Sequence, residues 1–560
     1  MKKHLLSFAT FALALVPASI HGQSDVLDRR ATWDTSAAEH LFNRAAFGAR
    51  PGELEYWVDK GRDALIEDLF RPAIEDADPF YVRLKDSREL RSKVRGMSKE
   101  DRQAFVRKTR REDARQLRDY LGWWYDRLLD GQAPITERMV LFWHGYFTSS
   151  YQDVKNSHEM IVQNQLFREY ALGDFDELLR KVARDPAMLE YLDNDDNKKG
   201  KPNENFAREL MELFTLGEGH YTEIDVKEAA RAFTGWTDRF GEFTSVKKRH
   251  DRGVKTVLGR TGRLDGDDVI DVLLAHPACA RYLATKLLTY FEGIEPGSER
   301  VARYAQLLRD ADWNVGEFLR ALFSDPEFYR DEIRGARISS PIDYLVGSAR
   351  RLGVDVPEGL VAVGSSVLGE RLFFPPNVKG WEGGRRWVTT STLMLRGNVA
   401  GLLTGSLKIR DLTELPAEDL AMAEEMMDEM MAGEMMEEDA PADPKGTKKR
   451  PKRAKAFGNE ELRMLRAIEA SGWSPRMNLT ARLRRQGART DAAIVDALGD
   501  ELLAVTLEAQ TRAELLEFLA EQRHGEGLED GALLDDPFTA EPLLRRLAHL
   551  LLSSPEAQLH

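Results

Sequence analysis

Residues 192–236 read LDNDDNKKGKPNENFARELMELFTLGEGHYTEIDVKEAARAFTGW. Over 204–216, apolar residues recur at helical spacing on one side, and acids with one arginine occupy the other. Gly217 and Gly219 then predict a turn, and Thr222 is a suitable cap for a second helix. The stretch therefore predicts a helix, a loop and a helix. Carboxylates, amides and one histidine are concentrated in this stretch, so we expect a reactive or metal-binding centre here.

The beginning of this stretch resembles a calcium-binding loop. Asp193, Asp195 and Asn197 alternate, and Glu204 follows Asp193 by eleven residues, which is the ligand spacing of an EF-hand. The sharp turn of that loop needs Gly at its sixth position, where this chain has Lys198. We expect these four acidic and amide residues to hold a divalent, calcium-like cation. The alternative is that they form a solvated turn that caps the next helix.

The rest of the chain has the same helical periodicity. Between Ala38 and Ala45, apolar residues recur at i, i+3, i+4 and i+7, and strand-like alternation is scarce along the whole sequence. The same pattern predicts helices over 52–70, 101–130, 135–147, 156–171, 174–184, 204–216, 223–234, 266–275, 278–292, 299–309, 315–323 and 341–352. The predicted fold class is mainly α, with a multi-helix globular body, an irregular helical array, over 36–410.

Composition changes abruptly over 411–457. Acids and methionines are concentrated up to Asp439, and the basic run KGTKKRPKRAK follows them. This low complexity predicts a disordered, inserted linker. Its methionines could form a copper-binding face of a helix, although an acidic helix paired with the basic run explains the same residues. Beyond it, 458–560 is predicted to be helical and to pack back on the main body, because an apolar face needs cover. That face comprises Leu543, Leu544, Leu547, Leu550 and Leu551.

Overall composition and charge narrow the class of protein. The 560 residues are 42% hydrophobic and 31% charged, which is the balance of a folded globular protein rather than a disordered or membrane protein. A formal net charge of −14 argues against general binding of nucleic acids, which requires a basic face. Cys279 is the only cysteine, so we expect packing, and no intrachain disulfide, to stabilise the fold.

The first residues have the pattern of an export signal. Lys2 and Lys3 precede an apolar run from Leu5 to Val16, which is too short for a membrane span, and small residues follow it. The run contains neither a twin-arginine pair nor a cysteine that could be lipidated. We expect residues 1–22 to be a Sec-type signal peptide. The mature chain is then expected to be periplasmic or extracellular, without a membrane span.

Candidate catalytic residues lie in and near the 192–236 stretch. Glu209 lies beside the apolar edge of its predicted helix, where partial burial would raise its pKa and suit it to general acid or base catalysis. His220 follows in the loop, and His144 lies in the aromatic run RMVLFWHGYF, either as a hydrogen-bonded core residue or as a site residue. We expect Arg208 and Glu212 to contact a ligand. The same arc of charge also fits an ordinary amphipathic surface helix.

The segment FFPPNVKGWEGGRRW (373–387) combines stiff prolines, flexible glycines and two tryptophans. Such a segment can form a rigid aromatic wall for a polymer such as a glycan, or it can simply hold a loop against the core. We expect Asn377, Lys379 and Trp381 to contact such a ligand. The sequence contains no GxSxG elbow, phosphate loop or dinucleotide fingerprint, and no haem signature.

Several motifs together resemble one bacterial family. They are AEHLFNRAAFG (38–48), RMVLFWHGYF (138–147), RDPAMLEYLD through ARAFTGW (184–236), VKTVLGRTG (254–262), FPPNVKGWEGG (374–384) and the closing LLLSSPEAQ. They resemble the family catalogued as domain of unknown function 1800, over about residues 36–410 and 458–558. The resemblance implies an exported, mostly helical protein, often encoded beside a secreted sulfatase-like partner. It transfers no catalytic residue.

The leading hypothesis from the sequence is an exported hydrolase, metal-assisted or carboxylate-based, that acts on an extracellular polymer such as a glycan. Glu209 would be the general acid or base, and His144 and His220 would orient water or substrate. The alternative is a non-catalytic, exported binding or assembly protein that works with a secreted partner. Convergence of these three side chains on one cleft beside 374–384 would favour the enzyme, and dispersal would favour binding.

Overall fold

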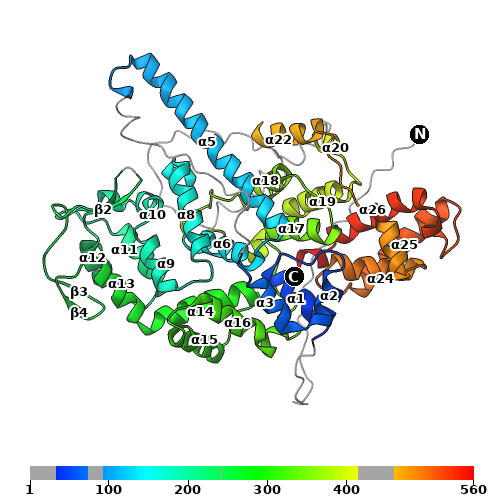
Figure 1. Cartoon of the computed structure of the whole chain (residues 1–560), viewed down its shortest axis with the longest axis horizontal. Coiled ribbons are helices and arrows are strands. Elements are labelled where there is room, and N and C mark those ends of the chain that lie inside the picture. Colours follow the sequence, from blue (N-terminus) through cyan, green and yellow to red (C-terminus); the bar gives the residue numbers. More distant parts are fainter. Residues whose placement is uncertain (1–32, 73–92, 240, 414–458) are drawn as a thin grey trace, which may run out of the picture.

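The computed structural model describes residues 33–72, 93–239, 241–413 and 459–560. Most regular elements in these ranges are helices, so the predicted fold class, mainly α, is confirmed (Figure 1). The predicted signal peptide over 1–22 and most of the predicted insertion over 411–457 lie outside the described residues. In the part of the chain that is described, no helix is both long enough and apolar enough to cross a membrane.

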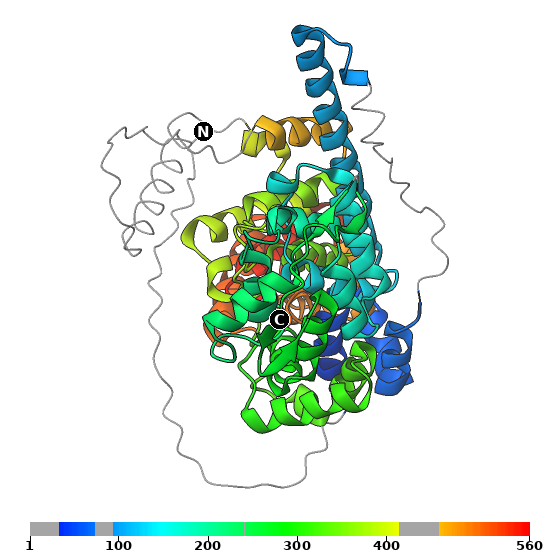
Figure 2. The same cartoon turned by 90° about the vertical axis from the view of Figure 1, so that its left-hand side faces the viewer.

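The helices of the first 232 residues include those that carry His144 and Glu209, and His220 lies in a loop between two of them. Their bounds are α1 (Thr35–Ala45), α2 (Glu53–Lys60), α3 (Arg62–Leu69), α5 (Lys99–Asp130), α6 (Pro134–Tyr146), α7 (Tyr151–Val154), α8 (Ser157–Glu169), α9 (Phe175–Val182), α10 (Pro186–Tyr191), η1 (Asn194–Asp196), α11 (Asn205–Glu212) and α12 (Glu223–Ala232). The helix predicted over 52–70 is two helices, because Gly61 adopts a φ of 93° between α2 and α3. The N-terminal half of α5 projects from the body (Figures 1 and 2).

Two short hairpins interrupt the helices, and the sequence pattern did not predict them. Strand β1 (Trp236–Asp238) pairs antiparallel with β2 (Phe243–Ser245), and β3 (Lys255–Val257) pairs antiparallel with β4 (Arg260–Gly262). Each strand has three residues, which is too few for alternation of apolar and polar side chains to be recognised.

The remaining helices complete the body. Their bounds are α13 (Gly266–Ala275), α14 (Pro277–Glu292), α15 (Ser298–Asp310), α16 (Val315–Ser324), η2 (Pro326–Tyr329), α17 (Pro341–Leu352), α18 (Glu358–Val367), η3 (Gly384–Trp387), α19 (Thr390–Thr404), α20 (Ile409–Thr413), α22 (Asn459–Ala470), α23 (Leu479–Gln486), α24 (Asp491–Leu502), α25 (Ala509–Gly525), η4 (Leu533–Asp535), α26 (Pro537–Ser553) and η5 (Glu556–Gln558). Helix α26 packs against α19 and α23–α25. Its Leu543, Leu544, Leu547 and Leu551 are buried, whereas Leu550 remains partly exposed.

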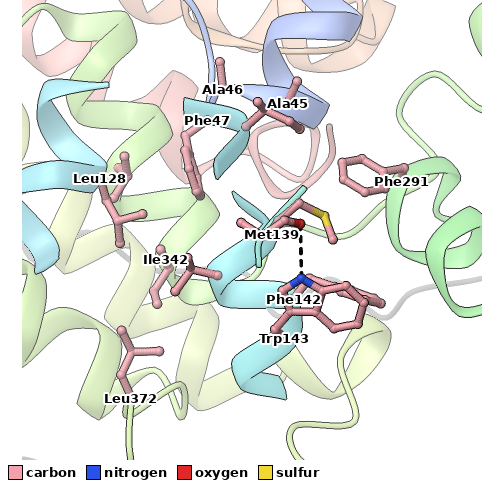
Figure 3. Packing of buried hydrophobic residues seen from close by; sticks show 14 of the residues in the cluster. Ala45, Ala46, Phe47, Leu128, Met139, Phe142, Trp143, Phe291, Ile342 and Leu372 are labelled. Carbon is pink, nitrogen blue, oxygen red and sulfur yellow. Dashed lines mark hydrogen bonds between the residues drawn. The ribbon is translucent and has the colours of Figure 1, made fainter. Parts of the chain in front are cut away.

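Helix α6 lies in the middle of the hydrophobic core. Met139, Phe142 and Trp143 are buried, and they lie among side chains from α1, α5, α14 and α17 (Figure 3). A helix that is covered on nearly all sides contributes apolar burial in every direction, at about 25 cal/mol per Å² of apolar surface. The rest of the fold is therefore arranged around α6.

A buried ion network crosses this core. Arg138 of α6 donates to the carboxylate of Asp343 in α17, and Arg337 Nη2 donates to the other oxygen at 2.9 Å. The Arg138 guanidinium also covers the ring of Phe47 at 3.7 Å and donates to the carbonyl of Asn43 at 3.2 Å. Burial alone would raise the pKa of Asp343, but the two guanidinium groups hold it well below its ordinary value. The network therefore joins α6, α17 and the loop after α1.

We expect Asp343→Asn to lower the free energy of unfolding by about 3–5 kcal/mol, because it leaves two buried guanidinium groups without a counter-charge. Urea denaturation checks this. Asp271→Asn is the control, since Asp271 forms an exposed pair with Arg180 at 2.7 Å and should cost about 1 kcal/mol or less. Equal losses in the two variants would contradict the role given to the buried network.

Candidate functional site

The four predicted cation ligands lie around the turn between α10 and α11. Asn197 is buried, and its Nδ2 donates to Asn194 Oδ1 at 3.0 Å and to the carbonyl of Ala230 at 2.9 Å. Its Oδ1 accepts from the backbone N–H of Asn203 at 3.0 Å. Asn197 therefore holds the loop against α12.

The three acids of the predicted ligand set face different partners. Asp193 is exposed, Asp195 accepts from the backbone N–H of Asp238 at 2.7 Å, and Glu204 pairs with Arg208 at 3.3 Å. Over the described residues, no three Asp, Glu, His or Cys side chains are arranged to hold a metal ion. The geometry resembles the alternative reading, a turn with its own hydrogen bonds. The cation itself stays a prediction from sequence spacing.

Asp195 instead belongs to a carboxylate cluster that the sequence did not reveal. We use this name for Glu159, Asp185, Glu190, Asp195 and Asp238, which come from α8, α10, η1 and β1. Burial first, and then the neighbouring acids with Asp238 foremost, raise the pKa of Glu159 to about 8. Burial likewise raises the pKa of Asp185 and of Glu190 to about 7, and it also raises the pKa of Asp238.

Two oxygens in this cluster lack a hydrogen-bond partner among the described residues. They are Glu159 Oε2 and Asp238 Oδ1. The other oxygen of Glu159 accepts from the Asn156 amide, and Lys155 is a cation that acts on Glu190. Because an ionised oxygen in a buried place needs partners, the burial of Glu159 favours its protonated form. Signals for it in the sequence are weak, since Asp185 occupies the position of a helix cap and Glu159 follows a histidine without a second histidine four residues later.

A second group of titratable side chains surrounds Glu209 in α11. Partial burial raises the pKa of Glu209, Glu212 raises it further, and Lys379 and Arg208 oppose the rise. Glu212 accepts a hydrogen bond from the Tyr221 hydroxyl at 2.8 Å. Lys379 belongs to the 374–384 segment, about 170 residues away in sequence, and it acts electrostatically on Glu209, so the fold brings that segment near α11.

Tyrosine and lysine side chains extend this group on α10 and α14. Burial raises the pKa of Tyr191 to about 12, and Glu209 adds to the rise. Burial also raises the pKa of Tyr282 to about 12, with a contribution from Glu212. Lys286, one turn after Tyr282, has its pKa lowered by burial and by Lys379. Nothing in the sequences of α10 and α14 distinguishes these three residues from other helical side chains.

The two predicted histidines do not join Glu209. His144 is buried, its Nε2 accepts from the backbone N–H of Phe373 at 3.0 Å, and burial lowers its pKa to about 3. His220 is exposed, with the ring of His276 6.1 Å away. His144 therefore supports the 373–387 segment from the core side. Of the two interpretations made from the sequence, the geometry of His144 corresponds to the core residue.

The 374–384 segment is held tightly on the end of α6. Thr148 Oγ1 donates to the carbonyl of Val378 at 2.6 Å, and a Cβ on Gly380 would lie 2.6 Å from the carbonyl of Gly145. Gly380 adopts a φ of 78°, so this approach requires glycine. The half-buried Trp381 has its ring 5.7 Å from that of His144, so it faces the core at least in part.

The other predicted ligand contacts have mixed positions. Asn377 is exposed, and its Oδ1 accepts from the backbone N–H of Lys379 at 2.8 Å. Lys379 itself is exposed. Arg208 forms a bidentate pair with Glu223, with both distances 2.7 Å, in addition to its contact with Glu204. Arg208 is therefore occupied by two acids, while Lys379 is available to a ligand.

We expect the carboxylate cluster to make stability fall as pH rises. Because these pKa values are raised, the folded chain holds more protons than the unfolded chain between about pH 4.5 and 8. The stabilisation that these protons contribute is complete below that range and is lost as pH rises through 7–8. Glu159→Gln should therefore become more stable relative to wild type as pH rises from 5 to 8.5. Urea denaturation at several pH values measures this.

Glu177→Gln, at an exposed position of α9, is the control for that series and should track wild type at every pH. A difference between Glu159→Gln and wild type that does not change with pH would show that the Glu159 carboxyl holds no extra proton in the folded chain.

Comparison with known proteins gives one match. The family model described as Protein of unknown function (DUF1800) matches residues 40–559, nearly the whole chain. No curated protein and no solved structure matches. The matched range includes both the carboxylate cluster and the residues around Glu209.

Proposed function

The chain belongs to the DUF1800 family, and we propose that it is an exported, carboxylate-based hydrolase that acts on a polymer such as a glycan. The observation that carries the proposal is the proximity of Glu209, Glu212 and Tyr221, from one stretch of the chain, to Lys379, from a distant one. Glu209 and Tyr221 have raised pKa values, and perturbed pKa values are characteristic of active sites, although ion networks also perturb them. Export rests on the expected signal peptide.

The proposed chemistry divides two roles between neighbouring glutamates. Glu209 and Glu212 are three residues apart on α11, so their side chains lie on the same face of the helix. Glu209, with its raised pKa, would donate a proton to the leaving oxygen as the bond to that oxygen breaks. Glu212, oriented by Tyr221, would take a proton from the attacking water. Solvent would then return both groups to their starting protonation states.

The lysines near the two glutamates would bind the substrate. Lys379 is exposed, and partial burial lowers the pKa of Lys286 while leaving its ammonium group close enough to Lys379 for mutual repulsion. This proposal gives His144 and His220 no catalytic role and needs no metal ion. A calcium-like cation at Asp193 remains a separate prediction, and a secreted sulfatase-like partner is implied only by the family.

Non-catalytic binding is the second candidate function. It is favoured by the separation of His144 and His220, since dispersal of the predicted catalytic side chains is the arrangement expected of a binding protein. In that case the 374–384 segment would present Lys379 to a ligand, and Glu209 and Glu212 would only complement its charge. Turnover distinguishes the two functions.

We expect the purified chain to release reducing ends from at least one polymer in a panel of neutral and acidic polysaccharides. Glu209→Gln should lower kcat on that polymer by about 10²–10⁴-fold, the range of general acid catalysis, with little change in KM. Glu218→Gln, at an exposed position in the loop between α11 and α12, should retain activity. Absence of turnover on the whole panel would favour the binding function.

We expect Lys379→Met to move the alkaline limb of the pH–activity profile to higher pH. Lys379 lowers the pKa of Glu209, so its removal raises that pKa further and keeps the acid protonated at higher pH. Lys181→Met, at an exposed position of α9, should leave the profile unchanged. A shift toward lower pH would contradict the assignment of Glu209 as the acid.

A further inference from the structure

A group of unpaired cations lies on one exposed surface of this acidic chain. We call it the basic surface, and it comprises Lys198, Lys199, Lys201, Lys247, Lys248, Arg249 and Arg252. The residues come from two loops about 50 positions apart in sequence. One loop precedes α11, and the other joins β2 to β3 (left side of Figure 1).

Direct hydrogen bonds join the two loops. The backbone N–H of Lys199 donates to the carbonyl of Arg249 at 2.7 Å, and Arg249 Nη1 donates to the carbonyl of Asp195 at 3.4 Å. Lys198 and Lys201 form a bridge around a tight turn. The cations of both loops therefore belong to one surface, although the sequence shows them as two separate runs.

Both loops are also anchored to the same buried segment. The backbone N–H of Gly235 donates to the carbonyl of Asn197 at 3.0 Å, and the backbone N–H of Val246 donates to the carbonyl of Gly235 at 2.7 Å. A Cβ on Gly235 would lie 2.8 Å from the Val246 carbonyl, so the second loop approaches this segment as closely as glycine permits. Thr234 Oγ1 also accepts a hydrogen bond from the backbone N–H of Asp251 at 2.7 Å. The scaffold under the cations is fixed before any ligand binds.

The cations of the basic surface are left without acidic partners. In the described ranges, none of the seven forms an ion pair, and the nearby Asp251 is engaged by Arg231 at 2.9 Å. Asp193 and Asp196 are the exposed acids of the first loop, which leaves a clear excess of positive charge. Like charges held together repel one another, and an anion that bridges them removes this repulsion.

We propose that the basic surface binds an anionic polysaccharide. Five of its seven cations are lysines, which act as flexible point charges, whereas recognition of nucleic acids favours the bidentate guanidinium group. Over 198–203 and 247–253 the two loops contain no Phe, Tyr or Trp ring on which bases could stack. Val254, close to Arg252, is an exposed apolar side chain, but a single valine contributes little to insertion into a bilayer. A flexible chain of carboxylates or sulfates meets the remaining requirements.

This inference goes beyond the proposed hydrolysis, because none of the seven cations belongs to the group around Glu209. If both proposals hold, the basic surface defines the class of the substrate as an acidic polysaccharide. Binding can be measured without turnover, and turnover can be measured on a neutral polymer. Failure of one proposal therefore remains distinguishable from failure of the other.

The test compares two quadruple variants of the full chain. The first, Lys198→Glu, Lys199→Glu, Lys247→Glu and Lys248→Glu, reverses the basic surface. The control, Lys181→Glu, Arg463→Glu, Arg485→Glu and Arg489→Glu, makes the same change in net charge at exposed positions elsewhere. Circular dichroism and urea denaturation confirm that both variants fold. Binding is measured to polygalacturonate, dextran sulfate, duplex DNA and phosphatidylglycerol vesicles at several salt concentrations.

We expect wild type to bind polygalacturonate or dextran sulfate more tightly than DNA or vesicles at equal salt. The surface variant should lose at least about tenfold in affinity and show a shallower salt dependence, because fewer counterions are released. Whichever polysaccharide binds tighter identifies carboxylate or sulfate as the preferred group. The proposal is overturned if the surface variant binds like wild type, if the control loses as much affinity, or if DNA or vesicles bind best.

Discussion

The pairing of Arg138 with Asp343 inside the core is the constraint on which the rest of the arrangement depends. A charge in a dry environment must have a partner, so α6 and α17 can pack in only one register relative to each other. Arg337 completes the pair, and the side chain of His560 lies 3.8 Å from the same carboxylate. Segments from the beginning, middle and end of the chain are thereby fixed around α6.

The position of α6 in turn fixes the 374–384 segment. Gly380 lies against Gly145 at the end of the helix, and His144 accepts from the backbone of Phe373. Lys379 is consequently held near α11. His144, a catalytic candidate from the sequence, therefore supports this segment. Lys379, which the segment carries, acts electrostatically on Glu209.

Charge is distributed unevenly around the loop between α10 and α11. On the inner side, Asp195 joins the buried carboxylate cluster. On the outer side, Lys199 meets Arg249 and contributes to the basic surface. Burial and neighbouring acids raise the pKa values of Glu159 and Asp185, because ionising several carboxyls in one confined place is costly. The cations on the outer side are exposed, so they are the groups that a ligand can reach.

The sequence by itself determined the helical fold class, most helix positions and the proximity of Glu209 and Glu212, because helical periodicity and spacing along one helix are local properties. For Asn197 and His144 it indicated residue types only, since spacing does not specify the partners that their atoms find. Only the tertiary structure decided which segments meet. The carboxylate cluster, the electrostatic effect of Lys379 on Glu209 and the hydrogen bond between Lys199 and Arg249 all depend on long-range packing. That packing follows from how the core buries its apolar surface and pairs its charges, which no short stretch of sequence encodes.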